Sequence, residues 1–197
     1  SLARNYNFST DELKQMKIAG YLHDIGKLSL PLSILNKNDK LDEREWALMR
    51  GHTYRTYKVL ESIEEFPEIK KWAAYHHEKL DGSGYPFHLT EKELDIGSKI
   101  MVVADIYTAL TEDRPYRDGF ENKKIISILN DNVENNKIDK EITDIIINNI
   151  DRYNEIREKS QNNSIKKYRD FKKNLTYIVS KRIRMEKEIN NLFHESI

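Results

Sequence analysis

The chain has 197 residues with 33 basic and 33 acidic side chains, so its formal net charge is zero. A balanced charge argues against a globally basic nucleic-acid binder, though not against a local basic patch, and the lack of cysteine excludes disulfides, thiolate zinc fingers and a cysteine nucleophile. No apolar run approaches the ~18 residues of a membrane span, and the first residues lack the apolar stretch of a signal peptide. We therefore expect a cytoplasmic protein, or the cytoplasmic part of a larger, membrane-linked one.

The predicted elements are helices, because only four prolines and seven glycines interrupt the chain. Ser9 and Glu12 form the S-x-x-E pattern of a capping box, which predicts a helix over LKQMKIAGYLHD. This helix places His23 on its buried face and ends or kinks at Gly26. Pro31 then starts a short segment, PLSILNK.

Acidic residues predict the start of the next long helix, which opens at Asp42 and Glu45. The spacing of its apolar residues predicts an inward side marked by Trp46, Met49, His52 and Leu60.

Pro67 suits the first turn of a further helix, which the sequence predicts to carry His76 on its inner face and His77 beside it. Adjacent helical residues point about 100° apart, so both histidines can be ligands only if two metal ions flank the helix. The DGSGYP segment (81–86) has the composition of a turn and is predicted to be a loop.

A second capping pattern, Thr90 with Glu93, precedes an apolar stretch over 97–112. This stretch is predicted to be a helix buried on most sides, with Asp105 in its middle. A charged acid there costs several kcal/mol unless it is compensated, and a metal ion is the simplest compensation. A buried arginine or histidine partner is the alternative.

Two more helices are predicted, one over 121–131 and one from Asp139 through IIINNIDRYNEI. The polar SQNNS (160–164) predicts a break between a main domain, residues 1–159, and a C-terminal helix, residues 164–197.

The C-terminal helix carries apolar residues that alternate steps of three and four, with one arginine among them. This pattern indicates either a parallel coiled-coil homodimer or an amphipathic helix packed on the domain. The seam consists of Phe171, Leu175, Ile178, Arg182, Met185, Ile189 and Leu192.

Imidazoles and carboxylates recur in successive predicted helices, and four of the six histidines belong to this set. Nitrogen and oxygen ligands from several segments are typical of a cluster of divalent metal ions. The ordinary alternatives are hydrogen-bonded core histidines and a helix-capping aspartate. The candidate metal ligands are His23, Asp24, His52, His76, His77 and Asp105.

Other residues suit recognition of a phosphate ester. Lys27 places a cation just past the first helix, and Arg114 with Arg117 suits bidentate phosphate contacts. Tyr85 can stack on a base or hydrogen-bond a phosphate. The alternatives are a lysine that complements a helix dipole, a tight turn and surface arginines. Together with the ligand set, these residues favour a metal-dependent hydrolase.

The combined motifs resemble the HD-GYP family of bacterial phosphodiesterases over about residues 10–155. The matching segments are HDIGK (23–27), His52, HHEKLDGSGYP (76–86) and KIMVVADIYTALTEDRPYR (99–117), in the family's order. The resemblance implies an all-α fold, a helical bundle of the HD superfamily around a centre of two or three divalent metal ions. Iron or manganese is favoured, with zinc among the alternatives.

The resemblance also implies roles for individual residues. Asp24 would bridge two ions, and Lys27 would contact the scissile phosphate. The remaining ligands would be His23, His52, His76, His77 and Asp105, and the substrate would be held by Asp81, Gly84, Tyr85, Pro86, Arg114 and Arg117.

The activity implied is hydrolysis of cyclic di-GMP to linear pGpG or GMP by a metal-bridging hydroxide, with cyclic GMP-AMP as a substrate of some members. An upstream sensory or receiver domain and GGDEF-type proteins are the expected partners. The family normally has a further histidine ligand upstream, whereas no histidine precedes His23 here. A catalytically impaired binding or interaction module is therefore one alternative, and another HD-type phosphohydrolase is a second.

Overall fold

A computed structural model describes residues 2–62, 66–112 and 118–194, and for 183 and 186–194 it describes the backbone alone. Within these ranges the regular structure is helical, and strand pairing is limited to an isolated bridge between Asp81 and Thr90. The prediction of an all-α fold is thus confirmed.

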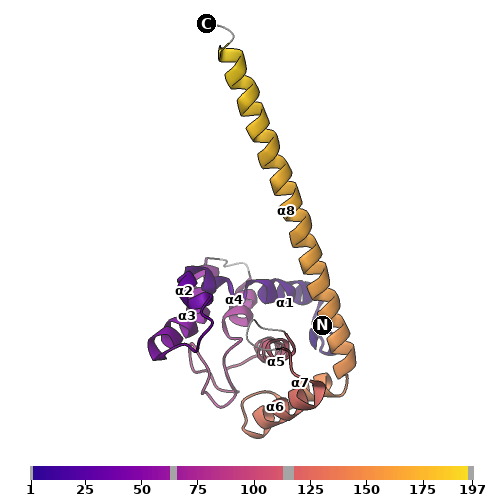
Figure 1. Ribbon diagram of the computed structural model, residues 1–197. Coiled ribbons are helices and arrows are strands. Elements are labelled where there is room, and N and C mark those ends of the chain that lie inside the picture. The colour runs from indigo at the N-terminus through magenta and orange to yellow at the C-terminus, as the bar shows by residue number, and fades with distance from the viewer. Residues whose placement is uncertain (1, 63–65, 113–117, 195–197) are drawn as a thin grey trace. The chain divides into compact units, whose positions relative to one another are not determined.

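Eight α-helices and two short 3-10 helices follow one another along the described residues (Figure 1). Their bounds are η1 (Leu2–Asn5), α1 (Thr10–Leu22), η2 (Ile25–Ser29), α2 (Leu32–Leu35), α3 (Glu43–Leu60), α4 (Pro67–Ala74), α5 (Ile96–Thr111), α6 (Asn122–Glu134), α7 (Lys140–Ile147) and α8 (Ile150–His194).

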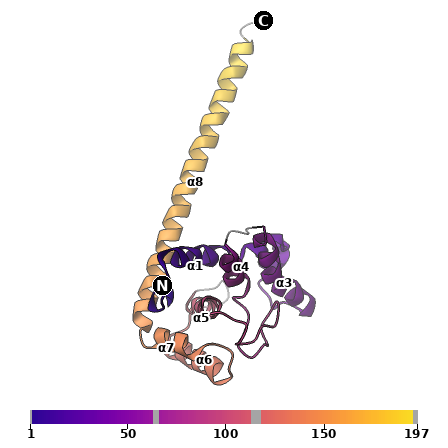
Figure 2. The same cartoon turned by 180° about the vertical axis from the view of Figure 1, so that it is seen from behind.

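The chain forms two compact units, residues 1–150 and 151–197, and each is described by itself. In the first unit α5 lies in the middle, with α1 and α4 on one side and α6 and α7 on the other (Figures 1 and 2). Helix α4 contacts α1, α3 and α5, so it joins the helices that supply the candidate ligands. The domain limits predicted from the sequence stay a prediction.

Helix α5 is central because most of its sides are apolar, as the sequence predicts. The consecutive residues 100–103 are all buried. Gly97 lets α5 approach α4 closely, since a Cβ atom at this position would lie 2.2 Å from Nε1 of Trp72. The same indole donates a hydrogen bond to Asp95, the N-cap of α5, at 3.1 Å. These contacts hold the first turn of α5, the helix that carries Asp105, against α4.

The predicted helix starts are largely confirmed. Capping boxes form at Ser9 with Glu12 and at Asp42 with Glu45, and Pro67 lies in the first turn of α4. The pattern Thr90 with Glu93 makes its hydrogen bonds, but the residues after it form a turn, and α5 begins only after Asp95.

The predicted inward side of α3 is partly wrong, because the side chain of Trp46 is 47% exposed. At about 100° per residue, Trp46 lies 120° around the helix from His52, so the two cannot share a buried face. His52 and Leu60 are buried as predicted.

Two boundaries near the C-terminus also differ from prediction. The helix expected from Asp139 onward is two helices, because α7 ends at Ile147 and α8 begins at Ile150. The expected break at 160–164 is helical, inside α8. Its polar side chains remain solvated on a helix, and their lower helix propensity costs only tenths of a kcal/mol each.

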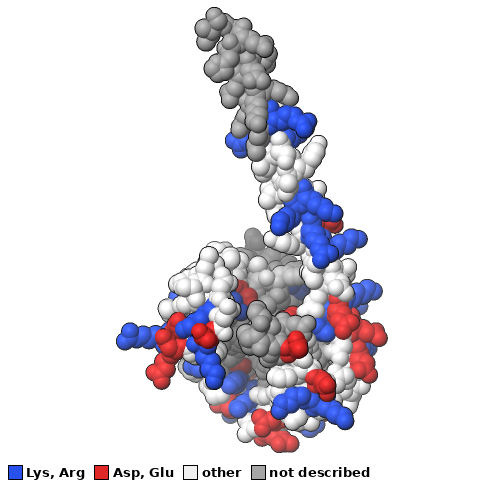
Figure 3. All heavy atoms as spheres, in the orientation of Figure 1, with Lys and Arg blue, Asp and Glu red and all other residues white. Residues whose placement is uncertain are grey.

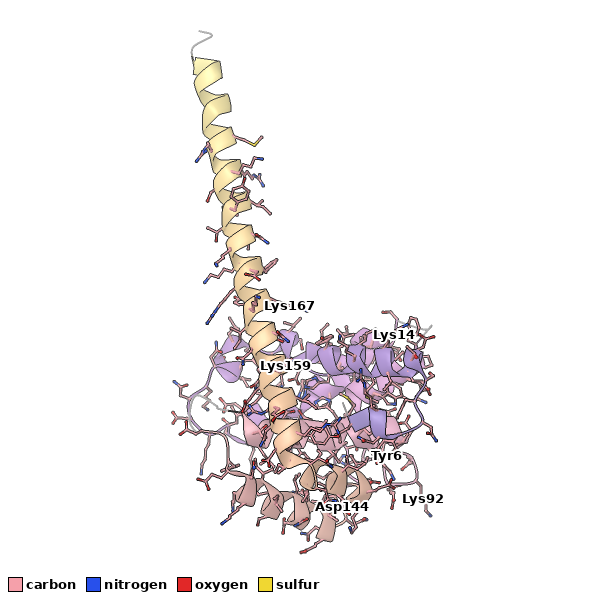
Figure 4. The ribbon with its side chains drawn as sticks, turned by 90° about the vertical axis from the view of Figure 1, so that its right-hand side faces the viewer. Tyr6, Lys14, Lys92, Asp144, Lys159 and Lys167 are labelled. Carbon is pink, nitrogen blue, oxygen red and sulfur yellow. The ribbon has the colours of Figure 1, made fainter. Side chains whose placement is uncertain are left out.

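In the second unit, every described side chain from residue 162 to 185 is exposed. Figure 3 shows Lys and Arg side chains along α8, and Figure 4 labels Lys159 and Lys167 on this helix. None of the helices in the described part of the chain combines the length and hydrophobicity that crossing a bilayer requires.

Candidate metal centre

Six predicted ligands from four segments of the first unit converge. His23 is the C-cap of α1 and Asp24 follows it, while His52 lies within α3. The others are His76 and His77, just past the end of α4, and Asp105 in α5. Donor atoms of His52, His76 and His77 lie within 4.8 Å of one another, as do those of His23, Asp24 and His76.

The turn that carries His23 and Asp24 is fastened to α3 by Thr56. The Thr56 hydroxyl donates to the carbonyl of His23 at 2.9 Å and accepts from the amide of Gly26 at 3.1 Å. A Cβ atom at Gly26 would lie 2.0 Å from the carbonyl oxygen of His52, so only glycine allows this approach. The first two ligands are therefore held directly against the helix that carries the third.

Three histidines use the same local contact to orient their rings. In each, Nδ1 lies at hydrogen-bond distance from the carbonyl three residues earlier. A carbonyl oxygen can only accept, so Nδ1 carries the proton and Nε2 is left as a lone-pair donor for a metal ion. The pairs are His23 with Gly20 at 2.8 Å, His52 with Met49 at 2.6 Å and His76 with Ala73 at 2.7 Å.

The Nε2 atoms of His52 and His76 face each other, and neither carries a proton. Their Nε2 atoms are 3.3 Å apart, and Oδ1 of Asp24 lies 3.3 Å from His52 Nε2 and 3.8 Å from His76 Nε2. That oxygen is buried and has no hydrogen-bond donor among the described residues. In the plane of these three atoms, the point equidistant from them lies about 2.0 Å from each. This is a normal metal–ligand distance. The three donors therefore fit one divalent cation.

The other oxygen of Asp24 faces a second group. Its Oδ2 lies 3.4 Å from Nε2 of His23 and 2.7 Å from Nζ of Lys27. The same His23 nitrogen is 3.8 Å from Oδ1 of Asp105, whose Oδ2 lies 3.5 Å from Nδ1 of His77. One carboxylate thus presents its two oxygens to two donor sets, as a bridging ligand does.

The electrostatics favour the metal-binding protonation states. Burial lowers the pKa of His76 well below its ordinary value and lowers that of His77 to about 3, so both rings are neutral near pH 7. For Asp24, burial raises the pKa, but the hydrogen bond and positive charge of Lys27, 2.7 Å away, act in the opposite direction, and the net pKa is lowered, so the carboxyl stays ionised. Neutral imidazole and ionised carboxylate are the forms that bind metal ions.

The loop with the GYP sequence is anchored beside this centre by Glu78. Its buried carboxylate accepts from the amides of Phe87 at 2.7 Å and Leu89 at 3.0 Å. Gly84 packs on the Glu78 backbone, where a Cβ atom would lie 2.4 Å from Cα. The ring of Tyr85 is thereby held with its centroid 5.0 Å from that of His77.

The structure describes two of the remaining predicted substrate residues, Pro86 and Asp81. Pro86 follows Tyr85 in the anchored loop, whereas Asp81 is exposed and accepts a hydrogen bond from the amide of Ser83 at 2.9 Å. Arg114 and Arg117 lie outside the described residues, so their role stays a prediction.

One part of the predicted geometry is wrong. Helix α4 ends at Ala74, and Tyr75 leaves the helical conformation with φ −94° and ψ 7°. His76 and His77 therefore sit in a turn, where His76 is buried and His77 half-buried. Both contribute to a single donor cluster, so two ions flanking a helix are not required for both to be ligands.

Sequence reasoning missed two residues. Thr56 gave no signal because a threonine within a helix is ordinary. Arg50 lies over the ring of Tyr85, with Cζ 5.7 Å from the centroid. The sequence offered one signal for Arg50, its position two residues before the candidate metal ligand His52. A positive charge near a metal site suits the binding of an anionic substrate.

Residues 1–142 match the sequence profile of the HD domain family. The chain belongs to the HD domain family. The matched residues include His23 and Asp24 at the end of α1, and Asp24 lies between the two donor sets.

Curated relatives support the narrower resemblance to HD-GYP proteins. The chain is 34% identical over 152 residues to 3'3'-cGAMP-specific phosphodiesterase 1 of Vibrio cholerae, covering 77% of this chain and 35% of the relative. It is 36% identical over 121 residues to a cyclic di-GMP phosphodiesterase of Pseudomonas aeruginosa, covering 61% and 29%. The chain thus spans about a third of the length of these relatives, and the resemblance to the HD-GYP family is confirmed.

Proposed function

We propose that this chain is the catalytic module of a metal-dependent phosphodiesterase that opens cyclic dinucleotides such as cyclic di-GMP or 3'3'-cGAMP. The observation that carries the proposal is the triangle of proton-free donors, His52 Nε2, His76 Nε2 and Asp24 Oδ1, at cation-binding separations. The relatives named for these two substrates support the substrate class.

We propose that two divalent cations bind here, with Asp24 bridging them. His52 and His76 would hold one ion, and His23 and Asp105 the other, with His77 close to both sets. Nitrogen and carboxylate ligands suit iron, manganese or zinc. When bound, such ions supply Lewis acidity and make water a stronger nucleophile near neutral pH.

The protein's own contribution is to place and neutralise the phosphate. Lys27 holds its ammonium 2.7 Å from Asp24, at the second donor set. A phosphoryl oxygen docked there would meet this charge, which stabilises the negative charge that develops during in-line attack. Tyr85, held by the Glu78 anchor, offers a ring face beside His77 for the rest of the nucleotide.

The test is hydrolysis of cyclic di-GMP and 3'3'-cGAMP by the chain reconstituted with Mn²⁺ or Fe²⁺ under anaerobic conditions, with products separated by chromatography. We expect linear dinucleotide or mononucleotide from at least one substrate. Asp24→Ala should abolish turnover, whereas Asp39→Ala, which changes an exposed acid outside the centre, should not. Intact substrate after metal loading, or full activity of Asp24→Ala, would contradict the proposal.

We also propose that α8 pairs with a second copy of the chain as a parallel coiled coil. The described seam side chains are all exposed, with Phe171 and Ile178 at 61%, Leu175 at 48% and Met185 at 52%. A stripe of this kind on a long helix gains stability only when a partner covers it. Because the seam repeats every seven residues, an identical helix is a matching partner.

Analytical ultracentrifugation of the full chain and of a chain ending at Asn163 tests this pairing. We expect a dimer that becomes a monomer on truncation, and a dimer that survives truncation would refute it. Replacement of the seam residue Arg182 by leucine should strengthen the dimer, because two facing arginines repel each other. The cytoplasmic location, the sensory or receiver domain and the GGDEF-type partners stay predictions from the sequence.

A further inference from the structure

A stack of planar side chains extends from the metal centre across α3. Arg50 lies between two aromatic rings, with Cζ 5.7 Å from the centroid of Tyr85 and 6.0 Å from that of Trp46. Tyr85 in turn neighbours the ring of the candidate ligand His77. The order from the centre outward is therefore His77, Tyr85, Arg50 and Trp46.

The outer part of this stack is open to solvent. Trp46 is 47% exposed, and Arg50 is an exposed residue on the same helix, one turn further on. An exposed tryptophan held against a guanidinium forms a flat, partly apolar surface with a positive charge, and base recognition uses such surfaces. We call the surface formed by Trp46, Arg50 and Tyr85 the α3 ledge.

The guanidinium of Arg50 has unused donors. Within the described residues no hydrogen bond or ion pair engages its side chain, although the two ring contacts hold it in place. Arg55 on the same helix differs, because its side chain donates to the carbonyl of Leu48 at 3.4 Å. A positioned guanidinium with free N–H groups is ready to donate to a ligand with two adjacent acceptors.

We propose that the α3 ledge is a nucleobase site in which Arg50 selects guanine. This inference rests on the proposed function, because it identifies which base of a cyclic dinucleotide lies beside the metal centre. A base attached to a phosphate held at Lys27 would pass Tyr85 and meet Arg50. The base would stack against the exposed ring of Trp46 while Arg50 donates to its edge.

The chemistry of the base edges gives the selectivity. Guanine presents two acceptors, O6 and N7, side by side, and a guanidinium can donate to both at once. Adenine presents the acceptor N7 beside an amino group. That amino group is a hydrogen-bond donor, so it cannot accept from the guanidinium. Glutamine at position 50 can donate to N7 and accept from that amino group, so it favours adenine instead. Arg50 is thus expected to set a preference of about 10- to 100-fold for guanine.

The test compares Arg50→Gln with Arg44→Gln, which removes the same charge from an exposed position on another side of α3. Affinities for cyclic di-GMP and cyclic di-AMP are measured on the chelator-treated full chain by calorimetry, so that binding is read without turnover. KM and kcat are then measured for both dinucleotides on the metal-loaded chain. Quenching of Trp46 fluorescence reports stacking, because the other tryptophan, Trp72, is buried.

We expect Arg50→Gln to lose the preference for cyclic di-GMP by about 10- to 100-fold, through KM rather than kcat, while Arg44→Gln keeps it. An unchanged preference in Arg50→Gln, or equal losses for both ligands, would overturn the assignment even if the chain is an active phosphodiesterase. A lost preference in a chain that never hydrolyses either ligand would support the base site and refute the proposed function instead.

Discussion

The contact that fastens the His-Asp turn to α3 can be tested by replacing Thr56 with valine, which keeps the side-chain volume but removes the hydroxyl. The Gly26 amide and the His23 carbonyl would each lose a partner in the interior. An unsatisfied buried group costs about 1–3 kcal/mol, so the loss of both partners should lower the free energy of unfolding by about 2–6 kcal/mol. Urea unfolding of the metal-free chain measures this value.

Metal affinity should fall as well, because the turn carries two ligands. Loss of a group that orients ligands typically weakens metal binding about 10- to 100-fold. Titration with Co²⁺, followed by its visible absorption, would report this change in Thr56→Val. The effect should appear for both proposed ions, since Asp24 faces both donor sets.

Thr53→Val is the matched control on the same helix. Thr53 is equally buried, but its hydroxyl donates only to the carbonyl of Arg50, which the helix itself already satisfies. The control should lose less than about 1 kcal/mol and keep its metal affinity. If Thr56→Val behaves like Thr53→Val in both assays, the hydroxyl does not position the centre and our reasoning is wrong.

Three further predictions concern the loop and the histidines. Glu78→Gln leaves one loop amide without an acceptor, which should cost about 1–3 kcal/mol in urea unfolding; an unchanged midpoint would contradict it. Gly84→Ala places a methyl 2.4 Å from the Glu78 backbone and should lower the melting temperature and raise KM for a cyclic dinucleotide; wild-type values would show that the loop can shift freely. The metal-free chain should lose stability as pH falls from about 6.5 to 4, because unfolding lets His76 and His77 take up protons that burial denies them when folded. The slope should approach about 1.4 kcal/mol per pH unit for each histidine, and His77→Ala should remove its share.

Helix positions could be predicted from the sequence wherever capping residues, proline or an apolar run determine them. Capping boxes, Pro67 and the apolar run around Asp105 placed α1, α3, α4 and α5 correctly. The end of α4 was not predictable, because no glycine or proline marks it. The break at 160–164 was wrong because polar residues are tolerated on a solvated helix.

The convergence of the candidate ligands was predictable because their residue types and spacing are unusual, whereas the residues that support them were not predictable. His23, Asp24, His52 and Asp105 are recognisable as a set from residue type and spacing alone. Thr56 and the carbonyls that orient the imidazoles cannot be recognised in this way, since a threonine or a backbone carbonyl carries no signal of its tertiary partner. Glu78 shows the same limit, because its role in holding a loop appears only when that loop is folded beside it.

The most direct test of the central claim, that Asp24 divides two cations between its oxygens, is an anomalous difference map from a crystal of the Mn²⁺-loaded chain. We predict two peaks, one near Oδ1 with His52 and His76 and one near Oδ2 with His23, each about 2.0–2.3 Å from its oxygen. A map without a peak at this carboxylate, or with ions bound elsewhere, would contradict the account.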